Sequence, residues 1–365
     1  HPAIHGGLLA DKHNKEHMDQ IAELGIEPFD MVVVNLYPFS DMLKKNLSFE
    51  QMIEYIDIGG PTMLRSAAKN MNSVAVVSCP QMYKSVMKEM KANDGAVGPG
   101  MRKALAHAVF EQTAGYDAQI AAYLAGEKRI GLTLEEKMPL RYGENPHQKA
   151  GLYIDAAEGA STFKQLGGKE LSFNNMLDIN SSVRIAYDFK TPACAVVKHT
   201  NPCGVALAQS ARDAYRKAYK SDPVSSFGGI IAFNLAVDAD AAKEIVKSGF
   251  REVVAAPSFS KDAVAILSEK KNLRIIQVGM KKSSGQDIKK TAFGYLIQDE
   301  DQAVIEADAL KVVTKKKPTK KQIEDMLFAW KIVKHVRSNA MVVVKNNITL
   351  GMGGGFTNRV DSFRY

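Results

Sequence analysis

The sequence predicts an α/β protein with two domains, and three observations support this. Short runs of β-branched and other apolar residues alternate with segments in which apolar residues recur at helical spacing. The chain has 365 residues, more than one average domain needs. Hydrophobic residues make up 45% and charged residues 24%, an ordinary balance for a folded protein that excludes disorder as the main state.

Two predicted strands and their accompanying helices occupy the first third of the chain. The strands are the apolar runs at residues 31–34 and 74–77, which we expect to lie buried in a parallel sheet. Helical patterns follow at residues 48–55, 81–90 and 100–124. The last pattern is long, its apolar side chains recur near one face, and Gly126 is expected to end it.

The composition becomes polar and charged between Gly126 and Arg141, and we predict the interdomain linker there. The two domains are therefore expected at residues 1–131 and 132–365. In the second domain, apolar runs predict strands at residues 194–197, 227–233 and 253–256, and capped helical patterns cover residues 210–220 and 238–247. The prediction ends with a helix that starts at Thr319 and a hairpin that joins residues 340–344 to 348–352.

Cysteine usage and hydropathy indicate a cytosolic protein without a membrane segment. Three cysteines in so long a chain do not form a disulfide framework, which favours a reducing compartment. The sequence contains no apolar run of roughly 18 residues and no secretory signal.

The excess positive charge, 48 − 40 = +8, is concentrated in lysines, above all in the run at residues 315–321. A basic, non-catalytic protein that binds nucleic acid is one interpretation. We favour a solvated surface, because no aromatic side chains interleave the lysines and because Thr319 and Gln322 have capping-box spacing. We therefore expect no nucleic-acid partner.

Lys198 and His199 are the strongest candidates for chemistry. They follow the predicted strand at residues 194–197, and the carboxyl ends of strands in α/β sheets are where ligands bind. His199 can exchange a proton near neutral pH, and Lys198 can stabilise an oxyanion. The Asn-Pro-Cys-Gly run at residues 201–204 is expected to form a turn that holds the pair outward. A plain strand exit with incidental polar residues stays equally open.

Other polar segments carry weaker signals. Residues 140–148 (LRYGENPHQ) are rich in groups that grip phosphate or carboxylate, although a polar interdomain turn is the alternative. Residues 168–178 contain an Asn pair for which helix capping is the favoured role. Ser338 and Asn339 precede the hairpin, and the glycine-rich stretch at residues 351–355 lacks a dinucleotide or P-loop pattern.

In the first domain, Gly59, Gly60 and Pro61 open a short helix and form a plausible anion site. Asp57 and Lys69 are candidates for an ion pair that keeps both side chains ionised. A helix cap with a surface salt bridge is the alternative.

Metal chemistry fits the sequence poorly. No C-x-x-C or H-x-E motif is present, so a zinc deaminase is disfavoured and no metal is expected. A Cys203 nucleophile beside His199 is a further, weaker alternative.

Eight segments occur in one order along the chain: NLYPF, IDIGGPTMLRSAAKN, RYGENPHQ, LSFNNMLDINS, VVKHTNPCG, DPVSSFGGIIAFN, RSNAMVVVKN and NRVDS. Together they closely resemble the PurH-type family of bifunctional purine biosynthesis enzymes, which join AICAR transformylase to IMP cyclohydrolase. The resemblance implies a methylglyoxal-synthase-like (Rossmann-like) first domain with cyclohydrolase activity. It implies a cytidine-deaminase-like transformylase second domain without zinc.

The resemblance also assigns site residues to both activities. For formyl transfer it implies Lys198, His199 and Asn339 as catalytic, with substrate bound by Arg141, Tyr142, Gly143, Phe227, Gly228, Glu252 and Arg359. For ring closure it implies Tyr37, Asp57 and Lys69 as catalytic, with substrate bound by Asn35, Ile58 and Gly59.

By the same resemblance, 10-formyltetrahydrofolate is the co-substrate, AICAR and its formylated product FAICAR are the other substrates, and no metal is required. It further implies a cytosolic homodimer with transformylase sites at the subunit interface. Residues 1–7 resemble an internal family segment, and family chains continue past the NRVDS motif, so we expect an internal fragment with both domains cut. Phe356 replaces a glutamine common in the family.

Overall fold

The computed structural model describes residues 1–126, 134–155, 162–279 and 285–364. The chain divides into two compact units, His1–Leu132 and Thr133–Tyr365. The prediction of a linker across Gly126 to Arg141 is wrong for residues 134–140, which form strand β3 (Leu134–Leu140) paired antiparallel with β4 (Ala150–Asp155). Because β3 is mostly exposed and carries charges on both faces, it lacks the alternating pattern that marks a strand.

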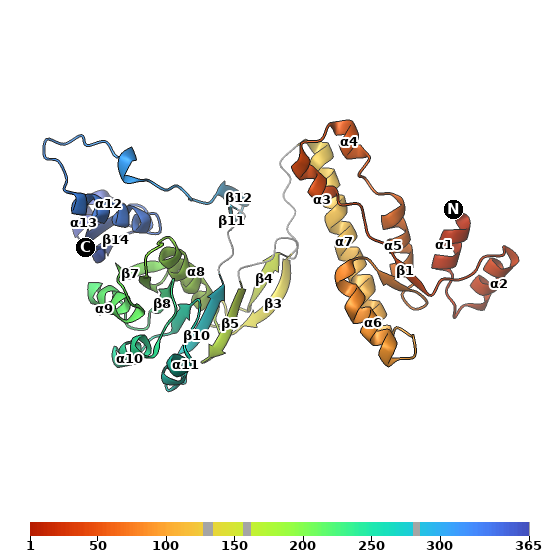
Figure 1. Cartoon of the computed structure of the whole chain (residues 1–365), viewed down its shortest axis with the longest axis horizontal. Coiled ribbons are helices and arrows are strands. Elements are labelled where there is room, and N and C mark those ends of the chain that lie inside the picture. Colours follow the sequence, from red (N-terminus) through yellow and green to blue (C-terminus); the bar gives the residue numbers. More distant parts are fainter. Residues whose placement is uncertain (127–133, 156–161, 280–284, 365) are drawn as a thin grey trace. The chain divides into compact units, whose positions relative to one another are not determined.

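The first unit contains a two-stranded parallel sheet surrounded by helices (Figure 1). Strand β1 (Met31–Val33) pairs in parallel with β2 (Ala75–Val77), as the sequence predicts. Only β2 is fully buried, because Val33 of β1 is 52% exposed. The helices are α1 (Pro2–Leu9), α2 (Lys15–Glu23), α3 (Phe39–Met42), α4 (Phe49–Ile53), α5 (Gly59–Lys69), α6 (Tyr83–Ala92) and α7 (Pro99–Ala125).

Helix α7 confirms the longest sequence prediction. A proline stands at its first position, and Gly126 ends it with a left-handed backbone (φ 59°) that a glycine adopts without penalty. Its buried face, which includes Leu105 and Val109, packs against β2 and α5 in the core of this unit. Of the helices in the described ranges, none combines the length and hydrophobicity needed to cross a membrane.

The second unit is built on an eight-stranded mixed sheet in the order β13-β14-β7-β6-β8-β9-β10-β5. The central strands β8 (Ile230–Phe233), β9 (Val253–Ala256) and β10 (Arg274–Gly279) are mutually parallel. The remaining strands are β5 (Thr162–Gly167), β6 (Ala193–Lys198), β7 (Asn201–Leu207), β13 (Met341–Lys345) and β14 (Ile348–Gly353). Strand β6 runs antiparallel to both of its neighbours, β7 and β8.

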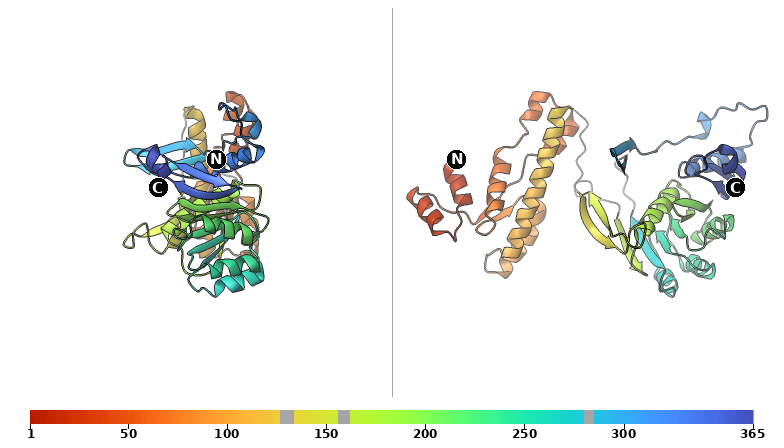
Figure 2. Two further views of the ribbon diagram at one scale, coloured as in Figure 1. Left: turned by 90° about the vertical axis from the view of Figure 1, so that its left-hand side faces the viewer. Right: turned by 180° about the vertical axis from the view of Figure 1, so that it is seen from behind.

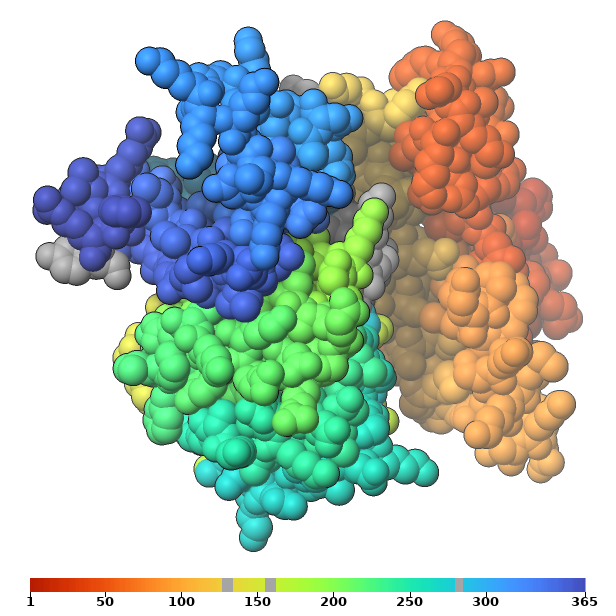
Figure 3. Space-filling model, turned by 60° about the vertical axis from the view of Figure 1, so that its left-hand side comes forward, coloured from red at the N-terminus to blue at the C-terminus, as the bar shows by residue number. Residues whose placement is uncertain are grey.

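Helices cover both faces of this sheet and bury two apolar layers. Helices α9 (Ala211–Ser221), α10 (Ala239–Lys247) and α11 (Lys261–Ser268) pack on one face and lie together on one side of the sheet (Figure 2). Helices α8 (Phe173–Tyr187) and α12 (Lys320–Val333) pack on the other. In the space-filling view the C-terminal segments lie directly against the chain around β6 and β7 (Figure 3).

Local signals in the second unit are confirmed at several positions. Thr319 and Gln322 form the predicted capping box at the start of α12. The turn between β13 and β14 has Asn346 and Asn347 at φ 57°, the left-handed geometry that asparagine tolerates. Ser172 and Asn175 cap α8, which confirms the structural role predicted for the Asn pair. The remaining elements are the hairpin β11 (Gln286–Thr291) with β12 (Gly294–Asp299), helix α13 (Arg359–Arg364), and the short 3₁₀ turns η1 (Leu43–Lys45), η2 (Pro80–Met82) and η3 (Ala307–Ala309).

Candidate active sites

Lys198 and His199 lie at the tip of the β6–β7 hairpin. Lys198 pairs with Asn201, so the turn consists of only two residues, His199 and Thr200, at φ 53° and 61°. Two positive φ values define the tight turn whose twist matches that of paired strands. The His199 side chain is exposed, and Lys198 is half-buried.

The predicted turn at residues 201–204 is wrong, because these residues begin strand β7. A bulge in the β6–β7 pairing, between Val196 and Val197, accommodates Pro202 in a strand that proline would otherwise interrupt. A side chain at Gly204 would overlap the carbonyl oxygen of Ala218 in α9. Pro202 and Gly204, which indicated a turn, therefore have other roles: Pro202 lies at the bulge, and Gly204 allows close contact with α9.

The carboxylate of Asp178 in α8 binds the backbone of this turn. Its Oδ2 accepts a hydrogen bond from the His199 backbone N–H at 3.1 Å, and its Oδ1 accepts one from Thr200 at 2.6 Å. Asn201 donates its side-chain amide to the His199 carbonyl at 3.0 Å. Burial raises the pKa of Asp178, partly opposed by the two backbone hydrogen bonds. Asp178 lies in the segment predicted to open a helix, and its contact with the turn is visible only in the fold.

Strand pairing brings several predicted residues to the same edge of the sheet as Lys198. Val197 pairs with Ile230, Ile230 with Val253, and Val253 with Arg274. These four paired residues lie side by side on neighbouring strands. The same end of those strands therefore carries Lys198, the Phe227–Gly228 segment and Glu252. The expectation that carboxyl ends of parallel strands meet here is wrong: β8, β9 and β10 present their amino ends beside Lys198, because β6 is antiparallel to β8.

Direct contacts join some of these residues. The Lys198 ammonium donates to the Phe227 carbonyl at 2.9 Å. The Phe227 ring is 59% exposed and lies 5.7 Å from the ring of Phe250. Gly228 has φ 71° and donates its N–H to the Phe250 carbonyl at 3.1 Å. Lys198 is thus held against the loop that precedes β8.

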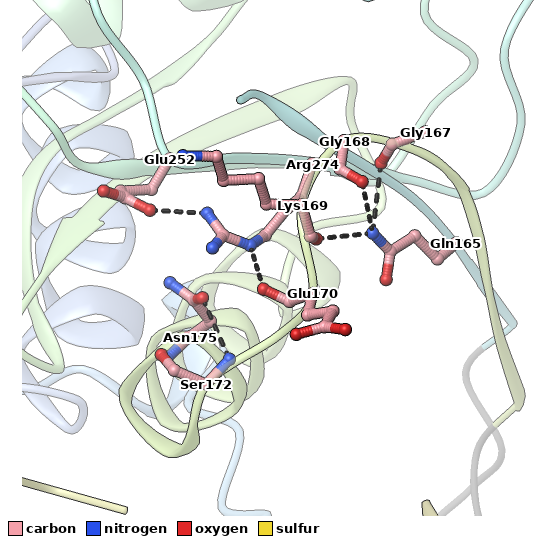
Figure 4. Close-up of polar contacts among 9 residues, drawn as sticks. All are labelled: Gln165, Gly167, Gly168, Lys169, Glu170, Ser172, Asn175, Glu252 and Arg274. Carbon is pink, nitrogen blue, oxygen red and sulfur yellow. Dashed lines mark hydrogen bonds and ion pairs between the residues drawn. The ribbon is translucent and has the colours of Figure 1, made fainter. Parts of the chain in front are cut away.

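Glu252 is oriented by an arginine that sequence reasoning missed (Figure 4). Arg274, only 4% exposed, donates to the Glu252 carboxylate at 2.6 Å and to the Glu170 carbonyl at 2.8 Å. The guanidinium therefore fixes both Glu252 and the loop that enters α8. The one available signal was a charged residue at the start of RIIQV, a run that otherwise contains three apolar residues and one glutamine.

Arg141, Tyr142 and Gly143 are tied to the start of α8. Arg141 donates its N–H to the Leu171 carbonyl at 2.9 Å, and the Tyr142 carbonyl accepts from Phe173 at 3.1 Å. The exposed Arg141 guanidinium lies 5.1 Å from the centre of the Tyr142 ring. A Cβ at Gly143 would crowd Gln148, so this glycine serves a tight turn. The segment is therefore an ordered part of the second unit.

Asn339 and Arg359 reach the same sheet edge through the antiparallel strands β7, β14 and β13. Asn339 stands two residues before Met341, which pairs with Gly353 at the end of β14. Its side-chain amide donates to the Phe356 carbonyl at 3.0 Å, and its own carbonyl accepts from Ser362 at 2.8 Å. Arg359 opens α13 and is exposed. The structure therefore places Asn339 at the edge but turned toward the C-terminal loop.

The first-unit candidates are dispersed by comparison. Asn35 and Tyr37 follow β1, and Asn35 donates to the Tyr83 hydroxyl at 3.2 Å. Asp57, Ile58 and Gly59 stand at the start of α5, whereas Lys69 is its last residue. Ten residue steps along a helix separate Gly59 from Lys69, about 15 Å at 1.5 Å per residue. The predicted Asp57–Lys69 ion pair is therefore wrong: the helix holds the two side chains at opposite ends.

Tyr116 of α7 holds the Asp57 segment in place. Its buried hydroxyl accepts from the Asp57 N–H at 2.7 Å and donates to the Tyr55 carbonyl at 2.9 Å. Burial raises the pKa of Tyr116, so it stays protonated. The Asp57 carboxylate in turn accepts from the Gly60 N–H at 2.8 Å, and a Cβ at Gly60 would overlap that carboxylate.

Tyr37 lines a cavity of about 400 Å³ in the first unit. The other lining residues are Pro38, Leu47, Gln51, Glu54 and Tyr55. Tyr55, which also lines the cavity, accepts from the Tyr116 hydroxyl that binds the Asp57 N–H, and this places the cavity next to the Asp57 segment. This cavity and the start of α5 form the candidate site of the first unit.

Two further candidates can be compared with the structure. Burial raises the pKa of Cys203 to about 11, which disfavours the thiolate that a cysteine nucleophile needs. Among the residues that the structure describes, no three His, Cys, Asp or Glu side chains gather as a metal site would require.

Comparison with known proteins supplies the family. The family model described as "AICARFT/IMPCHase bienzyme" matches residues 67–365, and that described as "MGS-like domain" matches residues 4–62. The chain is 48% identical to the bifunctional purine biosynthesis protein PurH of Thermoanaerobacter sp. (strain X514), covering 99% of this chain and 72% of that protein. The PurH proteins of Ruminiclostridium cellulolyticum and Clostridium botulinum (strain Kyoto) are 48% and 46% identical. These two matches cover 99% and 98% of this chain, and 73% and 72% of the relatives.

A solved structure titled "Crystal structure of ForH" matches 35% of this chain and 66% of its own chain at 33% identity, with a TM-score of 0.31. The family models and the relatives, which together span nearly the whole sequence, establish that the chain belongs to the AICARFT/IMPCHase bienzyme family and begins with an MGS-like domain.

Proposed function

We propose that this chain catalyses the last two steps of IMP synthesis, one in each unit. The second unit transfers the formyl group of 10-formyltetrahydrofolate to the amine of AICAR. The first unit closes the ring of the resulting FAICAR with loss of water. Membership of the family of bifunctional PurH proteins supports this pair of activities.

One observation carries the assignment of formyl transfer to a site. Residues far apart in the sequence, from Arg141 to Arg359, meet at one edge of the eight-stranded sheet through strand pairing and the start of α8. They include a histidine, a lysine, a carboxylate, an amide and two arginines. These are the groups that a phosphorylated substrate and a developing oxyanion require.

The amine of AICAR is a poor nucleophile, so formyl transfer requires catalysis at two atoms. The amine nitrogen must lose a proton, and the negative charge on the formyl oxygen must be stabilised. The amine nitrogen attacks the formyl carbon and loses its proton to His199, whose exposed imidazole can accept it. The carbon–N10 bond of the folate then breaks, and N10 takes up a proton as tetrahydrofolate leaves. His199 returns a proton in this step, so the enzyme ends unchanged.

Lys198 is assigned to the negative charge that develops on the formyl oxygen. Its ammonium carries three protons and uses one of them on the Phe227 carbonyl. That bond fixes the position of the charge and leaves two donors for the oxyanion. A preoriented cation at a half-buried site is an effective form of transition-state stabilisation.

Substrate binding is assigned to the groups around this pair. Arg141 and Arg359 offer guanidinium forks for the ribose phosphate. The exposed Phe227 ring supplies a flat surface for the imidazole, and Glu252 supplies an oriented acceptor. Asn339 helps to hold the formyl group, and Tyr142, Gly143 and Gly228 shape the walls.

Ring closure is assigned to the cavity beside Tyr37 and the start of α5. In ring closure, one group polarises the formyl oxygen and another accepts or donates the amide proton. A tyrosine, a carboxylate and a lysine can perform both tasks without a metal. Tyr37 and Tyr55 line the same cavity, and the Tyr55 carbonyl and the Asp57 N–H share the Tyr116 hydroxyl. We keep Asn35, Ile58 and Gly59 as contacts to the nucleotide, and Lys69 as a more distant candidate.

The assembly is proposed on the family resemblance. We infer a cytosolic homodimer whose transformylase sites lie at the subunit interface. Sedimentation of the intact protein that carries this sequence tests the dimer, and a single monomeric species at micromolar concentration would contradict it.

The site assignment is tested by formyl transfer to AICAR in the intact protein that carries this sequence. Lys198→Ala and His199→Ala are each expected to lower kcat by on the order of 10²- to 10⁴-fold. Lys243→Ala is the matched control, because Lys243 is an exposed lysine of α10 whose only described ion pair is at the surface. Wild-type rates in both site variants would remove the assignment.

A further inference from the structure

We propose that Asp178 is a positioning residue for formyl transfer, whose carboxylate holds the His199–Thr200 turn in the one conformation that presents the His199 imidazole to substrate. The proposal rests on the function proposed for Lys198 and His199. It adds a residue that does not touch substrate and acts through the backbone of the turn.

The turn needs an external restraint because its conformation is intrinsically disfavoured. His199 and Thr200 are adjacent non-glycine residues with φ of 53° and 61°. A left-handed backbone brings Cβ too close to the following carbonyl, and for a β-branched residue such as Thr200 it is a genuine outlier. Turns of this type usually carry Asn-Gly or similar pairs. Left to itself, this turn would leave the observed geometry.

Asp178 supplies the restraint with both carboxylate oxygens. One oxygen accepts from the His199 N–H and the other from the Thr200 N–H, at 3.1 and 2.6 Å. An ionised carboxylate only accepts hydrogen bonds, so it satisfies two converging donors at once. Asn201 holds the opposite side by donating to the His199 carbonyl at 3.0 Å. Hydrogen bonds therefore restrain both backbone N–H groups of the turn and the carbonyl of His199.

The carboxylate is itself anchored to a rigid element. Asp178 is followed in α8 by Ile179, which is buried in the core beneath the sheet. The start of α8 is fixed by the capping box of Ser172 and Asn175. Because α8 also packs on β6 and β8, Asp178 keeps a fixed relation to the sheet edge on which Lys198 lies.

This arrangement predicts which kinetic constant responds. The guanidinium groups assigned to substrate binding, Arg141 and Arg359, come from other segments: Arg141 is tied to the start of α8, and Arg359 opens α13. Loss of the clamp should therefore misplace His199 while leaving the nucleotide pocket intact, and a displacement of about 1 Å can lower a rate by about 10²-fold.

The first experiment compares Asp178→Asn and Asp178→Ala in the intact protein. An asparagine presents an NH₂ group to one of the two backbone donors, so only one hydrogen bond survives. We expect kcat for formyl transfer to fall on the order of 10- to 100-fold, with KM for AICAR changed by less than about threefold. Asp238→Asn is the control: Asp238 also accepts a backbone N–H, at the start of α10, where asparagine caps equally well.

The second experiment separates positioning from general stabilisation. Thr200→Gly removes the Cβ that opposes the left-handed conformation. Combined with Asp178→Ala, it is expected to recover about tenfold in kcat, with Thr200→Gly alone completing the cycle. If Asp178 only stabilised the fold, the loss in activity would follow the lower folded fraction measured by denaturant unfolding, and kcat per folded molecule would stay at the wild-type value.

The outcomes separate this proposal from the one on which it rests. A wild-type kcat in Asp178→Asn, with His199→Ala inactive, overturns the positioning role and leaves the proposed function standing. Wild-type activity in His199→Ala removes both. A rise in KM with unchanged kcat assigns Asp178 to binding and also overturns the proposal.

Discussion

The two units differ in how their candidate site residues are brought together. In the second unit, residues from five or more segments meet at one sheet edge because strand pairing fixes their register. In the first unit, Asp57 precedes α5 and Lys69 is the last residue of that helix, whose length from Gly59 to Lys69 is about 15 Å at 1.5 Å per residue. Closeness in the sequence is thus a poor guide to a shared site, whereas sheet topology is a good one.

The two sites also hold their key segments by different chemistry. Asp178 is a charged acceptor that restrains two N–H donors of the β6–β7 turn. Tyr116 is a neutral hydroxyl that donates to one backbone group and accepts from another around Asp57. The first device is needed where the backbone is disfavoured, and the second where an ordinary loop needs fixing.

We expect the largest effect when one candidate catalytic residue is replaced in each unit and both reactions are assayed in both variants. His199→Ala is expected to lower formyl transfer by about 10²- to 10⁴-fold while ring closure of supplied FAICAR stays within about twofold. Tyr37→Phe, which removes only a phenolic hydroxyl, should lower ring closure at least about tenfold and spare formyl transfer. Separate assays of the two reactions check this, and equal loss of both activities in either variant would contradict the division.

A large effect on stability is expected at Gly204. A methyl group there would overlap the Ala218 carbonyl between β7 and α9, so Gly204→Ala should lower the free energy of unfolding of the second unit by about 3 kcal/mol. Gly115→Ala in α7 is the matched control, because no atom of the described residues lies within 4 Å of a Cβ at that position. Alanine is the better helix former, so the control should stabilise by roughly 0.5–1 kcal/mol. Denaturant unfolding measures both, and similar destabilisation in the two variants would refute the packing argument.

Tyr116→Phe tests the clamp of the first unit. The variant keeps the ring contacts with Phe39 and leaves the Asp57 N–H and the Tyr55 carbonyl without their shared partner. We expect a loss of about 1–2 kcal/mol in unfolding free energy together with slower ring closure. Formyl transfer is the internal control, and a fall in that activity would show that the effect spreads beyond the first unit.

The smallest effect concerns how pH changes the stability contributed by Asp188, which contacts Lys334 and His335. Asp188 is partly desolvated, which raises its pKa, but hydrogen bonds from His335 and Lys334 outweigh this and leave the pKa lowered. A lowered pKa means that the native state binds fewer protons, so the stabilisation is present above the ordinary aspartate pKa, near 3.9, and is lost as pH falls through the folded value. The difference in stability between wild type and Asp188→Asn should be on the order of 1 kcal/mol at pH 6.

The same comparison at lower pH gives the check. Thermal unfolding should show the two proteins converging as the pH falls through the lowered pKa of folded Asp188, below which both side chains are neutral. A difference that persists unchanged to low pH would mean that packing, and not the ionised carboxylate, is responsible.

Local sequence signals predicted much of the fold. The helix that ends at Gly126, the capping box at Thr319 and the Asn346–Asn347 turn each depend on a few neighbouring residues. The signals failed where a distant partner decides the structure. Pro202 lies in a strand because a bulge absorbs it, and the exposed strand β3 carries no alternation to distinguish it from a linker.

The candidate sites show the same division. Lys198 and His199 could be singled out because their chemistry and their place after an apolar run are visible in the sequence. Arg274 and Asp178 could not, since their importance arises only when β10 and α8 are brought against Glu252 and the β6–β7 turn. The antiparallel direction of β6, which decides which strand ends share its edge, is likewise a property of the whole sheet.

The most direct test of the account is where AICAR protects the backbone. Hydrogen exchange followed by mass spectrometry, with and without saturating AICAR, locates the bound nucleotide on the intact protein. We expect slower exchange at the β6–β7 turn and at the Phe227–Gly228 loop, with little change around Tyr37 and the start of α5. Protection confined to the first unit, with the β6–β7 turn unchanged, would contradict the claim that formyl transfer takes place at this edge of the sheet.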